Sequence, residues 1–151
     1  MSYPIFKVDS FTDRAFGGNP AGVCFLDRAQ PEAWMQGVAA EMNVAETAFL
    51  VPRDGGFDLR WFTPTTEVDL CGHATLASAH LLWELGHLPR RAPARFYTRS
   101  MGDLVATLDT DGIALDLPAA ISSEVPEPRG LADALGAPAG AWYHVALYRC
   151  L

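Results

Sequence analysis

The chain has 151 residues, 50% of them hydrophobic and 19% charged, which predicts one soluble globular domain with an apolar core. Its 11 basic residues are scattered and are outnumbered by 18 acidic ones, giving a net charge of -7, so we expect no nucleic-acid partner. No apolar run approaches the roughly 20 residues that cross a bilayer, and no charged leader precedes an apolar segment, so we expect a cytoplasmic protein without a membrane partner.

The first third of the chain predicts two strands followed by a helix. Residues 3–11 and 21–26 are rich in strand formers, and the glycine-containing segment 17–20 between them is typical of a turn. Residues 31–42 predict a helix, because Pro31 suits a first helical position and apolar residues follow at spacings of three and four.

The middle of the chain predicts a hairpin and a second helix. A strand pattern resumes at 44–51, and after a turn at 54–56, apolar and polar residues alternate over 57–61. Residues 72–85 predict a helix that ends at Gly86. The residues expected on its buried face are Ala74, Ala77, Leu81 and Leu85.

The last third predicts a meander and a short helix. Residues 95–100, 104–109 and 113–117 are strand candidates separated by turn residues, which favours antiparallel pairing. Residues 118–130 are rich in Pro, Ser and Glu and indicate a linker, and 131–135 predicts one or two helical turns. Helices mixed with antiparallel strands predict an α+β fold. The sequence has no glycine-rich nucleotide-binding motif, so neither a dinucleotide site nor a P-loop site is predicted.

Glu46 is the acidic residue best placed for proton transfer. Its neighbours Val44, Ala45, Ala48 and Phe49 are apolar and predict a buried strand. Burial disfavours a charged carboxylate, which suits a group that both takes up and returns a proton. The alternative is a glutamate that faces solvent from the strand, the more common role of a lone glutamate.

Gly72 and His73 begin the predicted helix 72–85, where backbone N–H groups without helical partners bind anions. Glycine permits close approach of a ligand, so the pair predicts a site for a substrate carboxylate. His73 is expected to hydrogen-bond the substrate or to assist the proton transfer. The alternative is that His73 only caps the helix or packs in the core.

The histidines and cysteines do not predict a metal site. His73, His80 and His87 are seven residues apart, which is about 10 Å per step by helical rise and too far for one ion. The three cysteines lack the CxxC spacing of a metal or redox site, and we expect free thiols. Cys71 precedes the helix, where a thiolate is favoured, although a small packed residue is the simpler interpretation.

Three segments of the chain resemble the PhzF-like family of phenazine-biosynthesis proteins, in the same order and at the same spacing. The resemblance covers roughly residues 3–118, and its third segment is the most specific of the three. The segments are 16–23 (FGGNPAGV), 41–49 (EMNVAETAF) and 60–75 (RWFTPTTEVDLCGHAT).

The resemblance implies a diaminopimelate-epimerase-like fold, in which a mixed, mostly antiparallel sheet surrounds a central helix. It also implies an isomerase without cofactor or metal, which moves a proton on a small carboxylated compound of the dihydro-hydroxyanthranilate kind. Glu46 is then the catalytic proton shuttle, and Gly72 and His73 bind the substrate. In the related amino-acid racemases and epimerases a cysteine before a glycine is the base, so Cys71 leaves that alternative open.

Full-length members of the family have two such domains with the active site between them. By this comparison residues 1–118 are expected to form the N-terminal epimerase-like domain, and residues 119–151 a linker and an incomplete start of the second, as in a truncated product. Two functional interpretations follow. The chain is an isomerase completed by another chain, for instance in a symmetric homodimer, or a catalytically silent half-domain.

Overall fold

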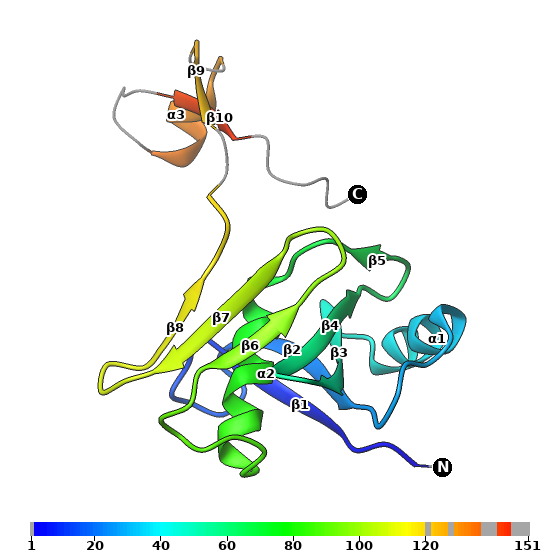
Figure 1. The fold of residues 1–151 in the computed structure, drawn as a ribbon. Coiled ribbons are helices and arrows are strands. Elements are labelled where there is room, and N and C mark those ends of the chain that lie inside the picture. The colour runs from blue at the N-terminus through cyan, green and yellow to red at the C-terminus, as the bar shows by residue number, and fades with distance from the viewer. Residues whose placement is uncertain (1, 120–121, 127–128, 137–141, 146–151) are drawn as a thin grey trace. The chain divides into compact units, whose positions relative to one another are not determined.

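The computed structural model describes residues 2–119, 122–126, 129–136 and 142–145. The chain divides into two compact units, Met1–Leu117 and Pro118–Leu151. The helices of the first unit are α1 (Glu32–Met42) and α2 (Gly72–Glu84) (Figure 1). Its strands are β1 (Ile5–Ser10), β2 (Asn19–Phe25), β3 (Glu46–Arg53), β4 (Gly56–Phe62), β5 (Glu67–Val68), β6 (Ala94–Tyr97), β7 (Asp103–Leu108) and β8 (Ile113–Asp116).

The strands of the first unit form one mixed sheet. The order is β1-β2-β3-β4-β6-β7-β8, and β5 pairs with the end of β4. The β2–β3 and β4–β6 pairs are parallel, and the remaining pairs of this sheet are antiparallel. β2 and β3 are parallel because α1 carries the chain back between them. The predicted α+β fold with a mostly antiparallel sheet is confirmed.

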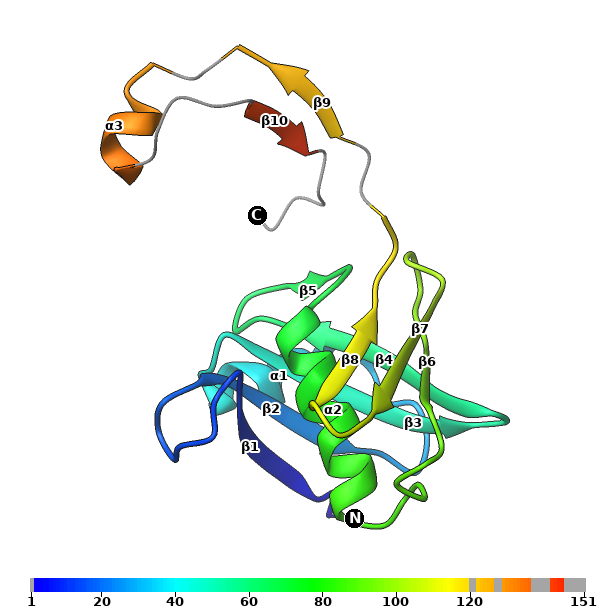
Figure 2. The same ribbon diagram turned by 90° about the vertical axis from the view of Figure 1, so that its left-hand side faces the viewer.

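α2 is the central helix of this unit, and the curved sheet surrounds it (Figures 1 and 2). It contacts β1, β2, β3 and β8, so strands from both edges of the sheet cover it. Ala74, Ala77 and Leu81 are buried as predicted, but Leu85 is 44% exposed. Leu85 is the C-cap, and Gly86 with a φ of 74° then turns the chain away from the sheet.

α1 packs on the other face of the sheet, against β3 and β4. The helix begins at Glu32, with Pro31 as its N-cap rather than its first residue. A second apolar cluster lies beneath it and contains Cys24, Leu26, Met35, Ala39, Phe49 and Phe62. Burial in this cluster raises the pKa of the Cys24 thiol to about 11.

The second unit contains β9 (Ser122–Val125), α3 (Leu131–Leu135) and β10 (Trp142–Val145). α3 confirms the helical turn predicted at 131–135. The prediction of a linker over 118–130 is wrong in part, because β9 lies within it and pairs antiparallel with β10. A polar segment becomes a strand here because a partner strand completes its backbone hydrogen bonds. No helix in the described part of the chain is long and apolar enough to cross a membrane.

Candidate active site

Glu46 is the first residue of β3, and its side chain is 19% exposed. Side chains alternate along the strand, so Glu46 shares the face of Ala48 and Leu50, which pack in the same core cluster as the α2 residues. The parallel register places Glu46 beside Ala21 of β2, which is fully buried. The carboxylate therefore lies at the edge of the core on the side of α2.

Gly72 and His73 form the first turn of α2, as the sequence predicts. The Thr75 amide and hydroxyl both donate to the Cys71 carbonyl, at 3.1 and 2.6 Å, and close this turn. The Ser10 hydroxyl donates to the His73 carbonyl at 2.8 Å, which ties the end of β1 to the helix. The amides before Thr75 have no helical partner by geometry, which is the arrangement that binds anions.

Three side chains from these two elements converge. Nε2 of His73 lies 3.3 Å from Oε2 of Glu46, and Nδ1 of the same ring lies 3.3 Å from Sγ of Cys71. Cys71 is 6% exposed and the His73 side chain 10%. We call Glu46, Cys71 and His73 the Glu46 cluster.

The contact between Glu46 and His73 is close without being a hydrogen bond. Oε2 of Glu46 and Nε2 of His73 are both buried, and neither has a hydrogen-bond partner among the described residues. Buried polar atoms are nearly always hydrogen-bonded, so this pair has bonding capacity that is available to a ligand or to water.

The same three side chains are of types that bind transition metals, and one donor atom from each lies within 4.8 Å of the others. Both ring nitrogens of His73 already face a partner, however, so a shared ion would have to displace one of those contacts. His80 is exposed, and the exposed His87 stacks on Phe25 with ring centroids 4.9 Å apart.

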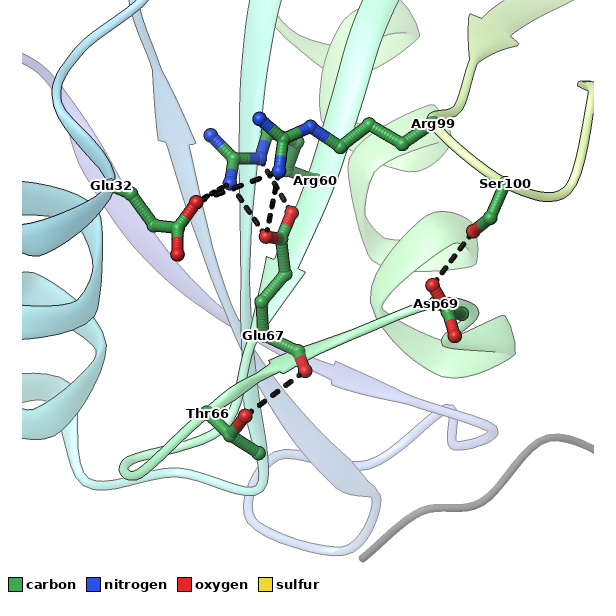
Figure 3. A network of polar contacts seen from close by, with 7 residues as sticks. All are labelled: Glu32, Arg60, Thr66, Glu67, Asp69, Arg99 and Ser100. Atoms are coloured by element: carbon green, nitrogen blue, oxygen red, sulfur yellow. Dashed lines mark hydrogen bonds and ion pairs between the residues drawn. The ribbon is translucent and has the colours of Figure 1, made fainter.

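A second polar centre, which we call the arginine network, was not predicted from the sequence (Figure 3). It lies on the α1 side of the sheet, where Arg60 donates to both Glu67 oxygens, at 2.5 and 2.6 Å, and to Glu32 at 2.8 Å. Arg99 donates to Glu67 at 3.1 Å. Hydrogen bonding to Glu67, the largest contribution, raises the pKa of Arg60. Alternation along β4 predicts only that Arg60 leaves the α2 face, whereas its partners come from distant segments.

Residues 8–131 match the family model of the phenazine biosynthesis-like proteins, PhzC-PhzF. The chain belongs to this family. An uncharacterized isomerase of Halalkalibacterium halodurans is 55% identical over 141 residues, which cover 90% of this chain and 51% of that protein. An uncharacterized isomerase of Pseudomonas aeruginosa is 50% identical over 138 residues, 90% of this chain and 52% of that protein.

Solved structures of the PhzF family share the fold. A PhzF-family protein of Enterococcus faecalis is 40% identical with a TM-score of 0.81, over 93% of this chain and 54% of that one. A putative PhzC/PhzF protein of Clostridium difficile is 38% identical with a TM-score of 0.79, over 95% and 54%. The chain therefore spans about half the length of the relatives that it matches.

Proposed function

We propose that this chain is the N-terminal half of a PhzF-type isomerase, in which Glu46 removes a proton from a carbon of a small carboxylated substrate and returns it to another. No cofactor takes part. The observation that supports this most is the partly buried Glu46 carboxylate, whose buried Oε2 faces His73 with unused hydrogen-bonding capacity at the start of α2. Such a group is positioned to exchange protons with a ligand rather than to bind the protein.

The first turn of α2 supplies the binding half of the site. A substrate carboxylate fits the free amides at the helix start, where the helix dipole also favours negative charge. A Cβ built on Gly72 would meet no atom within 4 Å, so the space in front of this residue is open. A ligand there lies close to both His73 and Glu46. A substrate of the dihydro-hydroxyanthranilate kind, in a biosynthetic pathway such as that of phenazines, fits these requirements.

We further propose that another domain or a second copy of the chain completes the site. Two aromatic residues in the loop after β1, Phe11 and Phe16, are 74% and 99% exposed, and both have left-handed backbone conformations. This loop adjoins Ser10, which is bonded to the first turn of α2. Exposed aromatic side chains held beside a site are typical of an interface. The 151-residue chain alone is therefore expected to self-associate and to lack turnover, which light scattering and an exchange assay test.

The decisive experiment follows solvent deuterium into the substrate in the complete enzyme. Glu46→Gln should lower turnover and exchange at least about a hundredfold, the usual contribution of a general acid or base. Glu41→Gln is the matched control, because Glu41 is exposed at the end of α1 and its substitution should leave turnover and exchange unchanged. Near-normal exchange in Glu46→Gln would exclude Glu46 from the mechanism.

The 3.3 Å contact between Cys71 and His73 favours a second candidate, a cysteine-based racemase or epimerase of an amino acid. The two candidates differ in which variant is inactive. Cys71→Ala should retain most of its turnover if Glu46 is the shuttle. An inactive Cys71→Ala together with an active Glu46→Gln would identify the racemase.

A further inference from the structure

The ring of His73 lies between two hydrogen-bonding groups of different chemistry. The Cys71 sulfur faces Nδ1 and the Glu46 carboxylate faces Nε2, each at 3.3 Å. A neutral imidazole has one donor nitrogen and one acceptor nitrogen, so its two neighbours together select a tautomer.

Cys71 and His73 would not face each other within a regular helix, where side chains two residues apart point in different directions. Cys71 is the N-cap, with φ -144° and ψ 106°, so its backbone is extended and its sulfur reaches the ring. The contact is therefore specific to the place where the chain enters α2.

Three protonation arrangements fit these neighbours. In the first, the thiol donates to Nδ1 and an Nε2–H faces the Glu46 carboxylate, which leaves one buried charge. In the second, an imidazolium faces the Glu46 carboxylate, which brings the buried charges to two beside a neutral thiol and to three beside a thiolate. In the third, a protonated Glu46 faces Nε2, and sulfur must serve as the acceptor, a role in which it is weak.

We propose that Cys71 is a positioning residue that fixes His73 as the neutral tautomer with its proton on Nε2. The first arrangement is favoured because both side chains are at least nine-tenths buried, and each additional buried charge carries a desolvation penalty. It also places an N–H, rather than a lone pair, on the side of the ring that faces the Glu46 carboxylate.

The consequence for catalysis rests on the proposed function. A neutral His73 with its proton on Nε2 has no basic nitrogen on the side of Glu46. The proton taken from the substrate therefore goes to Glu46 alone, and the same carboxyl group returns it. Cys71 acts through the ring and touches no reacting atom.

The test uses long-range ¹H–¹⁵N NMR of the histidine rings in the 151-residue chain, with the His73 signals assigned by their loss in His73→Gln. The wild-type chain should show the neutral Nε2–H pattern at neutral pH. Cys71→Ala should shift His73 to a mixture of tautomers, and Cys71→Ser should restore the pattern because a hydroxyl also donates. Cys24→Ala, which removes a buried thiol from the other apolar cluster, should change nothing.

Two results would overturn the proposal. An imidazolium pattern in the wild-type chain would show that His73 is not neutral, and rapid thiol alkylation at neutral pH that Cys71→Ala abolishes would further identify a thiolate pair. An unchanged tautomer in a folded Cys71→Ala chain would show that Cys71 does not select it. Neither result depends on turnover, so the proposal and the role of Glu46 are tested separately. In the complete enzyme, Cys71→Ala should retain most of its kcat, and Cys71→Ser should recover the remainder.

Discussion

The Glu46 cluster and the arginine network lie on opposite faces of one sheet and use their polar atoms in opposite ways. In the network, the carboxylate of Glu67 accepts two bonds from Arg60 and one from Arg99. In the cluster, His73 lies 3.3 Å from both Glu46 and Cys71, and Oε2 of Glu46 has no hydrogen-bond partner among the described residues. Charges whose bonds are satisfied fix a structure, whereas buried groups with unused capacity are available to a ligand. Both centres contain charged side chains, so unsatisfied hydrogen bonding, rather than charge, distinguishes the candidate site from the arginine network.

The largest effect on stability should come from the arginine network. Arg60→Met leaves the partly buried Glu67 with fewer partners and should lower the free energy of unfolding by about 2–4 kcal/mol. Arg99→Met is the matched control, because the Arg99 side chain is 64% exposed and should cost less than about 1 kcal/mol. Urea unfolding measures both. If Arg60→Met abolished turnover while leaving stability intact, the arginine network would belong to the active site rather than stabilise the fold.

Cys24 reports the effect of burial alone, because it is a buried ionisable group that belongs to neither centre. Its pKa is raised to about 11 from 9.0, so the folded state holds the proton more tightly than the unfolded state. The resulting stability is complete below pH 9 and declines as the pH rises toward 11, by about 3 kcal/mol in all. Cys24→Ala should remove this part of the decline in urea unfolding at a series of pH values. An identical decline in the variant would assign it to other groups.

Gly72→Ala tests whether the open space at the helix start belongs to the substrate. The added methyl group meets no protein atom within 4 Å, and alanine favours a helix, so stability should hold or rise slightly. The methyl group would occupy ligand space, so KM should rise about tenfold, a loss near 1.4 kcal/mol. Steady-state kinetics of the complete enzyme decide the question. An unchanged KM would show that the substrate carboxylate binds elsewhere.

The smallest effect should come from Thr47, which neighbours Glu46 in β3 but points to the other face. Thr47 is fully buried, and its hydroxyl has no hydrogen-bond partner within the described part of the chain. Thr47→Val removes this unsatisfied group at nearly constant shape and should stabilise the chain by about 1 kcal/mol. Thermal unfolding measures the change, and turnover should stay as it was. A loss of turnover would show that the hydroxyl belongs to the site.

Local sequence patterns predicted the elements because each reports a local preference. A run of strand-forming residues located β3, alternation located β4, and spacings of three and four located α1 and α2. The same patterns placed Glu46 in a strand and Gly72 and His73 at a helix start. That they lie together follows from β3 pairing beside β2 under α2. Local pattern did not predict this pairing, and the family resemblance implied only that these residues share a site and that a sheet surrounds a central helix.

What the sequence did not predict depends on contacts between distant segments. Glu32, Arg60, Glu67 and Arg99 lie in four separate segments, and no local pattern links them. The strand β9 requires β10 as its partner. The contact of Cys71 with His73 depends on a backbone angle at the N-cap, which residue types alone do not specify.

The coverage of α2 by strands from both ends of the first unit has a consequence for folding. β1 opens the unit and β8 closes it, and both contact the helix. These contacts join residues far apart in the sequence, and such contacts slow folding because a long loop must close before they form. During synthesis the helix stays partly uncovered until β8 has left the ribosome. A nascent chain that ends before residue 113 would expose the apolar surface of α2 and would be a target for chaperones.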